Sequence, residues 1–427
     1  MSDPGVYWVR PLSRPPDAVV EVPGSKSLTN RALLLAALAR GTSFIERALQ
    51  SEDTHYMAQA WQQLGIPVRF EAEHARFVVQ GGGGTFPARC AELFVGNAGT
   101  AMRFLTAALC LGRGVFRIDG TERMRQRPVG ELLQALRELG ADVASERGKD
   151  CPPVIVRAQG LAGGRTRIRA SQSSQFLSAL LQIGPCTARG LEVEVEGPLV
   201  AAPYVDMTVA VMAAFGGHVE REGYRHFVVA PTGYQGRTYE VEPDASSAHY
   251  FWAAAALCGG RVRTPGIGRA SLQGDVRFAE LLARMGAEVE MGADGIEVRG
   301  RGKLAGIDVD MNEISDTAMT LAVLGVFASG PVRIRNVAHL RLQESDRLHA
   351  AATELARLGI RVEEEADSLI VYPGAVQPGI VETYNDHRVA MSFALIGLKV
   401  PGIGIRNPRC VEKTFPGYFE ALETLRQ

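Results

Sequence analysis

The 427-residue sequence lacks long apolar runs, and its N-terminus lacks the pattern of an export signal. Its longest apolar stretches, such as Ala32–Ala39 and Met319–Ala328, fall well short of the roughly 20 residues that cross a bilayer. Asp3 and Pro4 stand where a secretory signal would place basic charge before an apolar segment. These absences argue against a membrane or secreted protein, and we expect a cytoplasmic protein with no membrane partner.

An excess of either charge is also missing. Lys and Arg total 46 against 47 Asp and Glu, which leaves a net charge of −1 with His neutral. No whole-surface basic field is present to recruit nucleic acid, so any anion site must be local. The six cysteines form no CxxC pair and no metal-ligand spacing. We therefore expect free thiols, no metal, no organic cofactor and no nucleic-acid partner.

Internal repetition organises what is present. Helix-end glycines followed by β-like runs recur at Gly65, Gly140, Gly216, Gly286 and Gly359. Polar clusters that open helices apolar nearly all round recur at Ser27, Gly99, Ser174, Ser246, Asp316 and Asp386. Both series step by 70 to 76 residues. The chain therefore contains six copies of one α/β unit.

Each copy predicts one buried helix, because a helix that is apolar on all sides has no face for solvent. A second helix ends at the glycine of the first series, which is a C-cap signal. Short strands are expected at 76–80, 153–157, 191–197 and 368–373. Two clusters of three buried helices, each inside three sheets, would use all six copies. Neither a Rossmann GxGxxG nor a P-loop pattern occurs in a suitable context, and we interpret Gly81–Gly84 as a flexible loop.

Several of the buried helices begin with basic side chains. These are Lys26 and Arg31, Arg103, His249, and His387 with Arg388. Helix N-termini present unpaired N–H groups and partial positive charge, so they are natural anion sites. Ordinary N-capping by Ser, Thr, Asn and Asp is the alternative for any single helix. Repetition along the chain favours anion binding.

Four motifs resemble the 5-enolpyruvylshikimate-3-phosphate synthases, which are 3-phosphoshikimate 1-carboxyvinyltransferases. They are Pro23–Arg31, Gly96–Arg103, Asp244–Ser247 and Tyr384–Arg388. The resemblance extends from about Pro23 to Pro416, nearly the whole chain. It implies an α/β fold of two domains, each with three repeated units whose buried parallel helices are surrounded by small mixed sheets, an inside-out α/β barrel. Domain 1 would comprise residues 1–23 plus 241–427 and domain 2 residues 24–240, with the active site in the cleft between them.

The resemblance also implies the reaction. Such enzymes transfer the carboxyvinyl group of phosphoenolpyruvate to the 5-hydroxyl of shikimate 3-phosphate by addition and elimination and release phosphate, in chorismate and aromatic amino-acid biosynthesis. The chemistry requires a base, an acid and cations for two phosphates and two carboxylates. The expected partners are these two small molecules alone, bound by a monomer without cofactor.

Site residues follow from the resemblance position by position. The catalytic residues would be Asp316 as the base for the hydroxyl, Glu344 as the acid, and Lys26. Shikimate 3-phosphate would be bound by Lys26, Ser27, Arg31, Ser173, Ser174, Gln175, Tyr204, Asp316, His339 and Gln343. Phosphoenolpyruvate would be bound by Lys26, Asn97, Gly99, Thr100, Arg127, Gln175, Arg347, Arg388 and Lys413. Asp346 and Asp386 would orient the cations from behind.

The sequence departs from the family at four of these places or beside them. Ala201 stands where a phosphate-binding Ser is frequent, and Phe104 replaces a common Pro on the helix that follows Gly99. Gln343 replaces a common Lys and His339 a common Asn. The positive charge of that Lys could be supplied instead by a protonated His339 or by a nearby arginine. If neither residue supplies it, we expect Gln343→Lys to improve turnover or acceptor binding.

Three other readings compete. The related transferase that acts on UDP-N-acetylglucosamine typically has a reactive Cys in the loop that spans residues 121–128 here, which contains none, and Asn at the position of Ser27. RNA 3′-phosphate cyclase is built on related repeats, but we find no candidate for its nucleotidylated His. A non-catalytic descendant, or a paralogue with another acceptor, is motivated by the departures. Retention of Asp316, Glu344 and Arg347 argues against lost chemistry.

Overall fold

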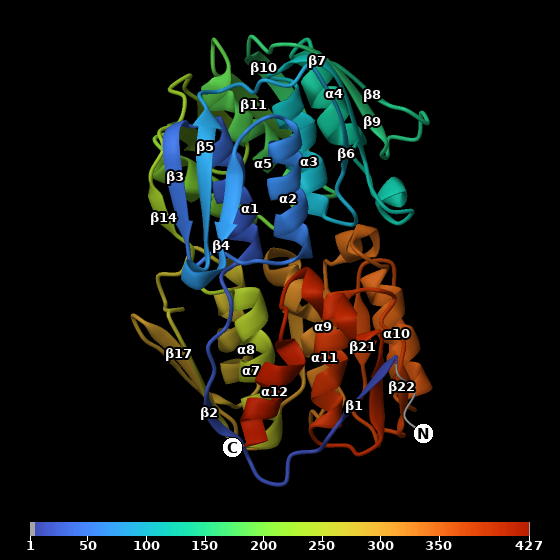
Figure 1. The fold of residues 1–427 in the computed structure, drawn as a ribbon. Coiled ribbons are helices and arrows are strands. Elements are labelled where there is room, and N and C mark those ends of the chain that lie inside the picture. Colours follow the sequence, from blue (N-terminus) through green and yellow to red (C-terminus); the bar gives the residue numbers. More distant parts are fainter. Residues whose placement is uncertain (1–4, 427) are drawn as a thin grey trace. The chain divides into compact units, whose positions relative to one another are not determined.

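A computed structural model describes residues 5–426 of the chain. The chain divides into two compact units. Unit 2 is the continuous segment Gly24–Val241, which runs from blue to green in Figure 1. Unit 1 combines the chain up to Pro23 with everything from Glu242 onward, so its yellow-to-red elements are joined by a short dark-blue segment. The two units are described separately below.

Unit 2 alternates helices and strands throughout. Its helices are α1 (Lys26–Leu38), α2 (Glu52–Gln63), α3 (Gly99–Leu109), α4 (Gly130–Glu138), α5 (Ser174–Ile183) and α6 (Pro203–Ala214). Its strands are β3 (Arg40–Glu46), β4 (Val68–Glu71), β5 (Arg76–Gly82), β6 (Cys90–Phe94), β7 (Arg113–Asp119), β8 (Asp142–Ser145), β9 (Val154–Gln159), β10 (Gly164–Arg169), β11 (Leu191–Glu196), β12 (Val219–Glu222), β13 (His226–Val229) and β14 (Thr238–Glu240).

Unit 1 repeats this alternation. Its helices are α7 (Ala245–Cys258), α8 (Phe278–Arg284), α9 (Ala318–Gly325), α10 (Arg347–Arg357), α11 (His387–Gly397) and α12 (Tyr418–Glu423). Its strands are β1 (Val6–Val9), β2 (Asp17–Val19), β15 (Arg261–Pro265), β16 (Glu288–Met291), β17 (Gly295–Arg299), β18 (Ile307–Asp310), β19 (Val332–Arg335), β20 (Val362–Glu364), β21 (Leu369–Val371), β22 (Gly379–Val381) and β23 (Ile403–Arg406).

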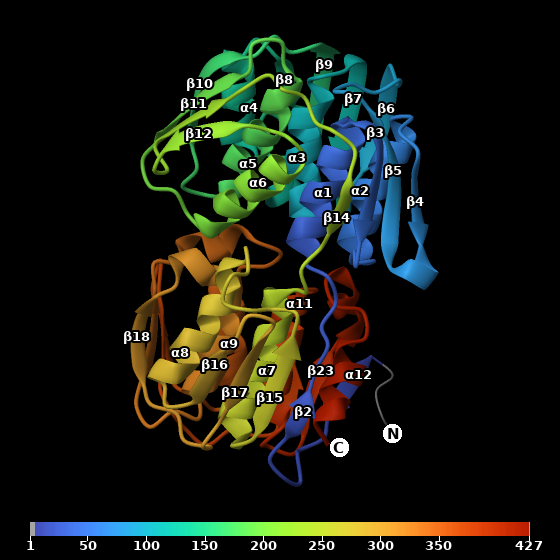
Figure 2. The same cartoon turned by 90° about the vertical axis from the view of Figure 1, so that its left-hand side faces the viewer.

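Each unit contains three small mixed sheets of nearly the same design. In the sheet β6-β7-β9-β8, β6 and β7 run parallel because α3 connects them, while β7 and β8 pair with β9 antiparallel. The N-terminal strands join unit 1 in the same scheme. Here β2 pairs with β15 in parallel (Figure 2), and β1 pairs antiparallel with β23. The predicted α/β fold of repeated units is confirmed.

The six helices predicted to be buried are buried. In α1, α3 and α5 of unit 2, and in α7, α9 and α11 of unit 1, nearly every residue is inaccessible to solvent. A chain of hydrogen bonds links the unit 1 helices. His249 Nε2 lies 2.8 Å from Thr320 Oγ1, which lies 2.9 Å from Ser392 Oγ. His249 is the fifth residue of α7, Thr320 the third of α9 and Ser392 the sixth of α11, so these bonds connect the three buried helices in their N-terminal or central turns.

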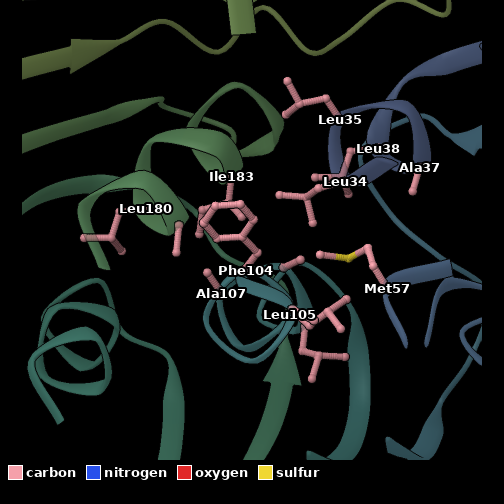
Figure 3. Close-up of a cluster of buried hydrophobic side chains, with 14 of the residues drawn as sticks. Leu34, Leu35, Ala37, Leu38, Met57, Phe104, Leu105, Ala107, Leu180 and Ile183 are labelled. Atoms are coloured by element: carbon pink, nitrogen blue, oxygen red, sulfur yellow. The ribbon is translucent and has the colours of Figure 1, made fainter. Parts of the chain in front are cut away.

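Figure 3 shows the unit 2 core where the buried helices meet. The ring of Phe104 from α3 lies among Leu34 of α1 and Leu180 and Ile183 of α5. All four side chains are fully buried. Burying one such side chain contributes about 1.5–3 kcal/mol, so the helices are held by packing on every side rather than by helix propensity.

The predicted helix-end glycines are confirmed as left-handed residues. Gly65, Gly140, Gly216, Gly286 and Gly359 have φ between +83° and +106°, and each lies two residues after the last helical residue. Glycine adopts this conformation without the penalty that a Cβ atom brings. The repeated glycine therefore ends the second helix of five copies.

The interpretation of Gly81–Gly84 as a flexible loop is wrong for its first half. Gly81 and Gly82 end β5, where they pair with Gly41 and Arg40 of β3. A Cβ on Gly81 would collide with the carbonyl oxygens of Ala36 and Ala39 at the end of α1. Glycine is required here for close packing of a strand on a helix end. Only the following two glycines form a turn, with φ of +68° and +94°.

Candidate active site

The start of α1 carries the first group of predicted residues in unit 2. Lys26 opens the helix, and its Nζ lies 3.4 Å from Oδ2 of Asp53, a buried residue in the first turn of α2. Ser27 follows and is half-buried. Asp53 was not found by sequence reasoning. Asp53 lies 27 positions after Lys26, and its own neighbourhood in the sequence indicates only the acidic first turn of a helix.

Arg31 is almost fully buried, and its hydrogen-bond partners are all neutral. Nε donates to Thr208 Oγ1 at 2.7 Å, Nη1 to the Ser27 carbonyl at 3.0 Å and Nη2 to the Tyr204 carbonyl at 3.0 Å. No carboxylate within residues 5–426 forms an ion pair with it. Burial lowers the pKa of Arg31 to about 10, so the guanidinium stays charged at neutral pH. A buried cation without a counter-ion favours an anionic ligand.

Two aromatic rings contact the Arg31 guanidinium. The guanidinium carbon of Arg31 lies 5.3 Å from the centroid of the Phe104 ring and 5.9 Å from that of Tyr204. Cation–π contacts of this kind contribute about 0.5–2 kcal/mol when desolvated. Phe104 is the residue that departs from the family pattern. It thereby connects α3 to the cation of α1.

The loop before α3 brings together the residues predicted for the donor. Arg127, which follows a short 3-10 helix (Met124–Gln126), donates from Nη1 to both the carbonyl and the side-chain oxygen of Asn97, at 2.9 and 3.1 Å. A Cβ on Gly99 would lie 2.5 Å from Nη2 of Arg127 and 2.8 Å from Nη1 of Arg103. Thr100 is buried beside it. Two guanidinium groups therefore lie directly over the glycine.

Arg103, which the sequence prediction placed at a helix start but omitted from the site, lies beside the candidate donor residues. Its Nη1 donates to the Gly99 carbonyl at 3.3 Å and its Nη2 to the Pro128 carbonyl at 2.9 Å. It is buried. The i to i+4 spacing from Gly99 was a signal that could have found it, because residues four apart share a helix face.

The start of α5 supplies hydroxyl groups. Ser173 is the N-cap and its Oγ accepts from the Gln175 N–H at 3.2 Å, while Ser174 is buried. Four residues along the same face, Ser178 Oγ lies 2.9 Å from Thr208 Oγ1, which itself accepts from Arg31. This chain of contacts places the α5 N-terminus on the same side of unit 2 as Arg31.

Unit 1 gathers three carboxylates around one guanidinium. Arg347, at the start of α10, is almost fully buried. Its Nη1 donates to Asp316 at 3.1 Å and its Nη2 to Glu344 at 2.9 Å, while its Nε donates to Asp386 at 2.9 Å. Burial alone would lower the pKa of Arg347, but the three carboxylates raise it above its usual range. The predicted base and acid therefore contact the same cation.

Two further cations complete this cluster. Arg388 Nη2 donates to the other oxygen of Asp316 at 2.6 Å, and Lys413 Nζ lies 3.9 Å from Glu344 Oε1. Arg388 and Lys413 are both buried. The formal charges of the six groups, three negative and three positive, sum to zero. An incoming anion adds negative charge to this neutral cluster, so it must compete with a carboxylate for a cation.

Asp346 and Asp386 were predicted to orient the cations of the site, but only Asp386 contacts one of them. Asp386 contacts Arg347 and also caps α11, since its Oδ1 accepts from the Arg388 N–H at 2.9 Å. Asp346 contacts none of the predicted cations. Its carboxylate turns back to the His349 N–H as the N-cap of α10 and pairs with Arg341. The capping geometry fixes its direction, so its predicted role in orienting cations is wrong.

His339 does not supply the charge that Gln343 lacks. Its Nε2 lies 2.8 Å from Ser315 Oγ, and burial lowers the pKa of His339 to about 4 despite the attraction of Asp316. A pKa this low makes the ring neutral at physiological pH, which argues against the alternative of a protonated His339. The alternative of a nearby arginine fits the contacts, because Asp316 is bonded by both Arg347 and Arg388.

Neutral His339 predicts a pH dependence of stability. Its folded pKa of about 4 lies below the ordinary value of 6.5, so between these limits the unfolded chain binds more protons. Stability should therefore fall as the pH decreases from 6.5 to 4, by up to about 1.4 kcal/mol per pH unit from this residue. Urea titrations of wild type and His339→Asn should show a shallower slope for the variant. The exposed His349→Asn is the control, and equal slopes would contradict the prediction.

Residues 5–426 contain neither a membrane-spanning helix nor a cluster with the arrangement of a metal site. None of their helices has the length and apolar character needed to cross a membrane. No cluster of three or more His, Cys, Asp or Glu side chains among them has the arrangement of a metal site.

The fold is similar to those of solved enolpyruvyl transferases. A solved EPSP synthase from Acinetobacter baumannii superposes with a TM-score of 0.80 at 27% identity, covering 98% of this chain and 97% of that one. The enolpyruvyl transferase NikO from Streptomyces tendae superposes with a TM-score of 0.74 at 22% identity, covering 98% and 97%, which supports the fold alone. The fold is thus that of the enolpyruvyl transferases.

The sequence is similar to those of curated members of one family within the enolpyruvyl transferases. A curated 3-phosphoshikimate 1-carboxyvinyltransferase from Nostoc punctiforme is 50% identical over 409 residues, covering 96% of each chain. One from Marinomonas sp. is 46% identical over 422 residues, covering 97% of this chain and 98% of that one. The family model of EPSP synthase (3-phosphoshikimate 1-carboxyvinyltransferase) matches residues 13–422. The chain belongs to the EPSP synthase family.

Proposed function

We propose that the protein transfers the carboxyvinyl group of phosphoenolpyruvate to the 5-hydroxyl of shikimate 3-phosphate and releases phosphate. The observation that carries the proposal is the cluster at Arg347, where two candidate proton-transfer groups, Asp316 and Glu344, contact one buried cation. Family membership supplies the two substrates. The reaction yields 5-enolpyruvylshikimate 3-phosphate for aromatic amino-acid biosynthesis.

Unit 2 binds the acceptor in this proposal. Arg31 offers a desolvated charge with no carboxylate partner, and the hydroxyls of Ser173 and Ser174 at the α5 N-terminus suit a phosphate dianion. Lys26 reaches both substrates, and its contact with Asp53 keeps the ammonium in place before they arrive. Gln175 contacts both substrates, while Tyr204 covers the acceptor ring beside Arg31. Asn97, Gly99, Thr100 and Arg127 bind the donor.

Unit 1 supplies the proton transfers. Glu344 takes up a proton when the donor replaces it beside Arg347 and Lys413. Asp316 takes the proton of the acceptor hydroxyl as its oxygen attacks C2 of phosphoenolpyruvate, and Glu344 gives its proton to C3, which becomes a methyl group. The tetrahedral adduct then returns a methyl proton to Glu344 while its C–O bond to phosphate breaks, and the proton held by Asp316 leaves with the phosphate. Arg347, Arg388 and Lys413 stabilise the donor anions throughout. His339 and Gln343 contact the acceptor hydroxyls as neutral groups.

The direct test is phosphate release from phosphoenolpyruvate and shikimate 3-phosphate. We expect stoichiometric phosphate and a carboxyvinyl ether detected by mass spectrometry, unchanged by a metal chelator, because the cations above already neutralise the substrate anions. UDP-N-acetylglucosamine should be inactive as the acceptor. Absence of product at saturating substrates, or a strict metal requirement, would refute the proposal.

Gly99→Ala should weaken donor binding. The new methyl group would lie within 3 Å of two guanidinium nitrogens, of Arg127 and Arg103, so one must shift. Because a displaced charge-assisted hydrogen bond is worth about 1.5–3 kcal/mol, we expect KM for phosphoenolpyruvate to rise on the order of tenfold or more while KM for the acceptor changes little. Gly330→Ala, where a Cβ meets open space and φ is not positive, is the control, and a selective rise in acceptor KM would contradict the assignment.

Gln343→Lys tests whether the site lacks an ammonium group. Gln343 immediately precedes Glu344, and a cation near Asp316 would lower the pKa of that carboxylate. If charge limits the reaction, the variant should show a higher kcat or a lower acceptor KM, with the acidic limb of the pH profile shifted to lower pH. A neutral or harmful effect would mean that the arginines already bonded to Asp316 suffice.

A further inference from the structure

The turn that precedes α11 has an unusual backbone. Tyr384 and Asn385 both have φ of +54°, and the Asp386 N–H donates to the Thr383 carbonyl at 2.8 Å. Positive φ at both central residues defines a type I′ turn, which Asn-Gly favours. A bulky aromatic residue is an outlier in this conformation. Contacts from outside the turn must therefore maintain it.

Asn407 provides one such contact, since its Nδ2 donates to Asn385 Oδ1 at 3.0 Å, and Glu354 of α10 provides two others. Its carboxylate is fully buried, with Oε1 accepting from the Tyr384 hydroxyl at 2.7 Å and Oε2 from the Glu382 N–H at 3.0 Å. Arg357 neutralises it at 3.0 Å. The Tyr384 side chain is otherwise exposed, so packing does not hold it. The buried carboxylate thus binds the chain on the N-terminal side of the turn and the tyrosine within it.

The turn leads directly into the Arg347 cluster. Asp386 is its last residue, and it bonds Arg347 through Nε at 2.9 Å and Ser345 through Oγ at 2.9 Å. Arg347 and Glu354 lie on the same helix, two turns apart. The helix α10 therefore holds residues 382–386 at two points. One contact is made at the active cluster, and the other lies outside it.

We propose that Glu354 is a positioning residue for the reaction. It keeps the strained turn closed so that Asp386 holds Arg347 against Asp316 and Glu344. The catalytic readout of this inference rests on the proposed function, whereas the geometry of the Arg347–Asp386 pair does not. Glu354 contacts no substrate in this account and acts only through the turn.

The experiment combines loss and rescue. Glu354→Ala should lower kcat/KM for phosphoenolpyruvate on the order of 10²-fold, because misplacing a catalytic group by about 1 Å has an effect of that size. Glu354→Ala with Tyr384→Asn should recover most of the loss, since Asn adopts positive φ far more readily than Tyr and no longer needs the carboxylate. Glu363→Ala is the matched control and should stay near wild type, because Glu363 is a surface carboxylate that likewise bonds a tyrosine hydroxyl, that of Tyr372 at 3.0 Å, and an arginine.

Crystal structures of the same variants supply a readout that needs no substrate. The Arg347–Asp386 hydrogen bonds should be lost in Glu354→Ala and restored in the double variant. A Glu354→Ala enzyme that keeps the Arg347–Asp386 hydrogen bonds and wild-type kinetics overturns the inference. A double variant that regains wild-type thermal stability but not kcat/KM for phosphoenolpyruvate overturns it as well. If Glu354→Ala does not fold, Glu354→Gln, which keeps one acceptor oxygen, should show the same donor-specific loss at several-fold size. A wild type inactive on both substrates refutes the proposed function but leaves the crystallographic test valid.

Discussion

Glu344→Gln is expected to lower kcat by about 10²–10⁴-fold, the usual effect of removing a positioned proton-transfer group. Donor binding should not weaken. Glu344 contacts Arg347 at 2.9 Å and lies 3.9 Å from the Lys413 ammonium, so a neutral amide leaves these cations with one negative charge fewer and favours an anionic substrate. KM for phosphoenolpyruvate should therefore stay constant or fall. Steady-state kinetics with both substrates varied measures the two parameters separately.

The control for this variant is Glu363→Gln. Glu363 is an exposed carboxylate that pairs with Arg361 on the surface of the same unit. It should retain wild-type kinetics. A Glu344→Gln enzyme within threefold of wild type, or one whose defect is confined to KM, would exclude Glu344 from proton transfer. Single-turnover measurements would then have to identify another acid.

The repeat made the fold predictable from sequence. Apolar residues on all sides of segments such as Ala32–Leu38 leave only a buried position, and Gly140 in a recurring helix-end motif leaves only a left-handed cap. The error at Gly81–Gly84 arose because four glycines resemble a loop locally, whereas the requirement for glycine came from the end of a distant helix. Composition cannot distinguish these two causes.

The candidate site divided in the same way. Resemblance predicts which residues contact the ligands, but it did not predict the residues that hold those side chains in place. Asp53 and Glu354 support Lys26 and the turn before Asp386, and no local pattern distinguishes them from ordinary helix carboxylates. Asp346 was misassigned because its capping bond to its own helix outweighs attraction to a cation farther away. Neutral His339 likewise depends on burial, which a sequence does not display.

Arg31→Met is expected to raise KM for shikimate 3-phosphate on the order of 10²-fold or more, equivalent to about 3 kcal/mol of lost binding. The reason is that Arg31 bonds a hydroxyl and two carbonyls and forms no ion pair with a carboxylate of residues 5–426, so its charge is available to the acceptor phosphate. KM for phosphoenolpyruvate should change far less. Arg31→Lys should recover only part of the loss, because an ammonium lacks the planar fork that bonds an oxyanion and stacks on rings.

Stability distinguishes a binding role from a structural one at this position. A buried charge without a counter-ion is costly in the free protein, so Arg31→Met should leave the free energy of unfolding unchanged or increase it. Arg76→Met is the matched control, since Arg76 also lies over a ring, that of Phe44, but pairs with Glu71 and Glu46. It should leave acceptor KM unchanged. Loss of stability in Arg31→Met together with unchanged acceptor KM would make Arg31 a structural residue, and the acceptor phosphate would need another cation.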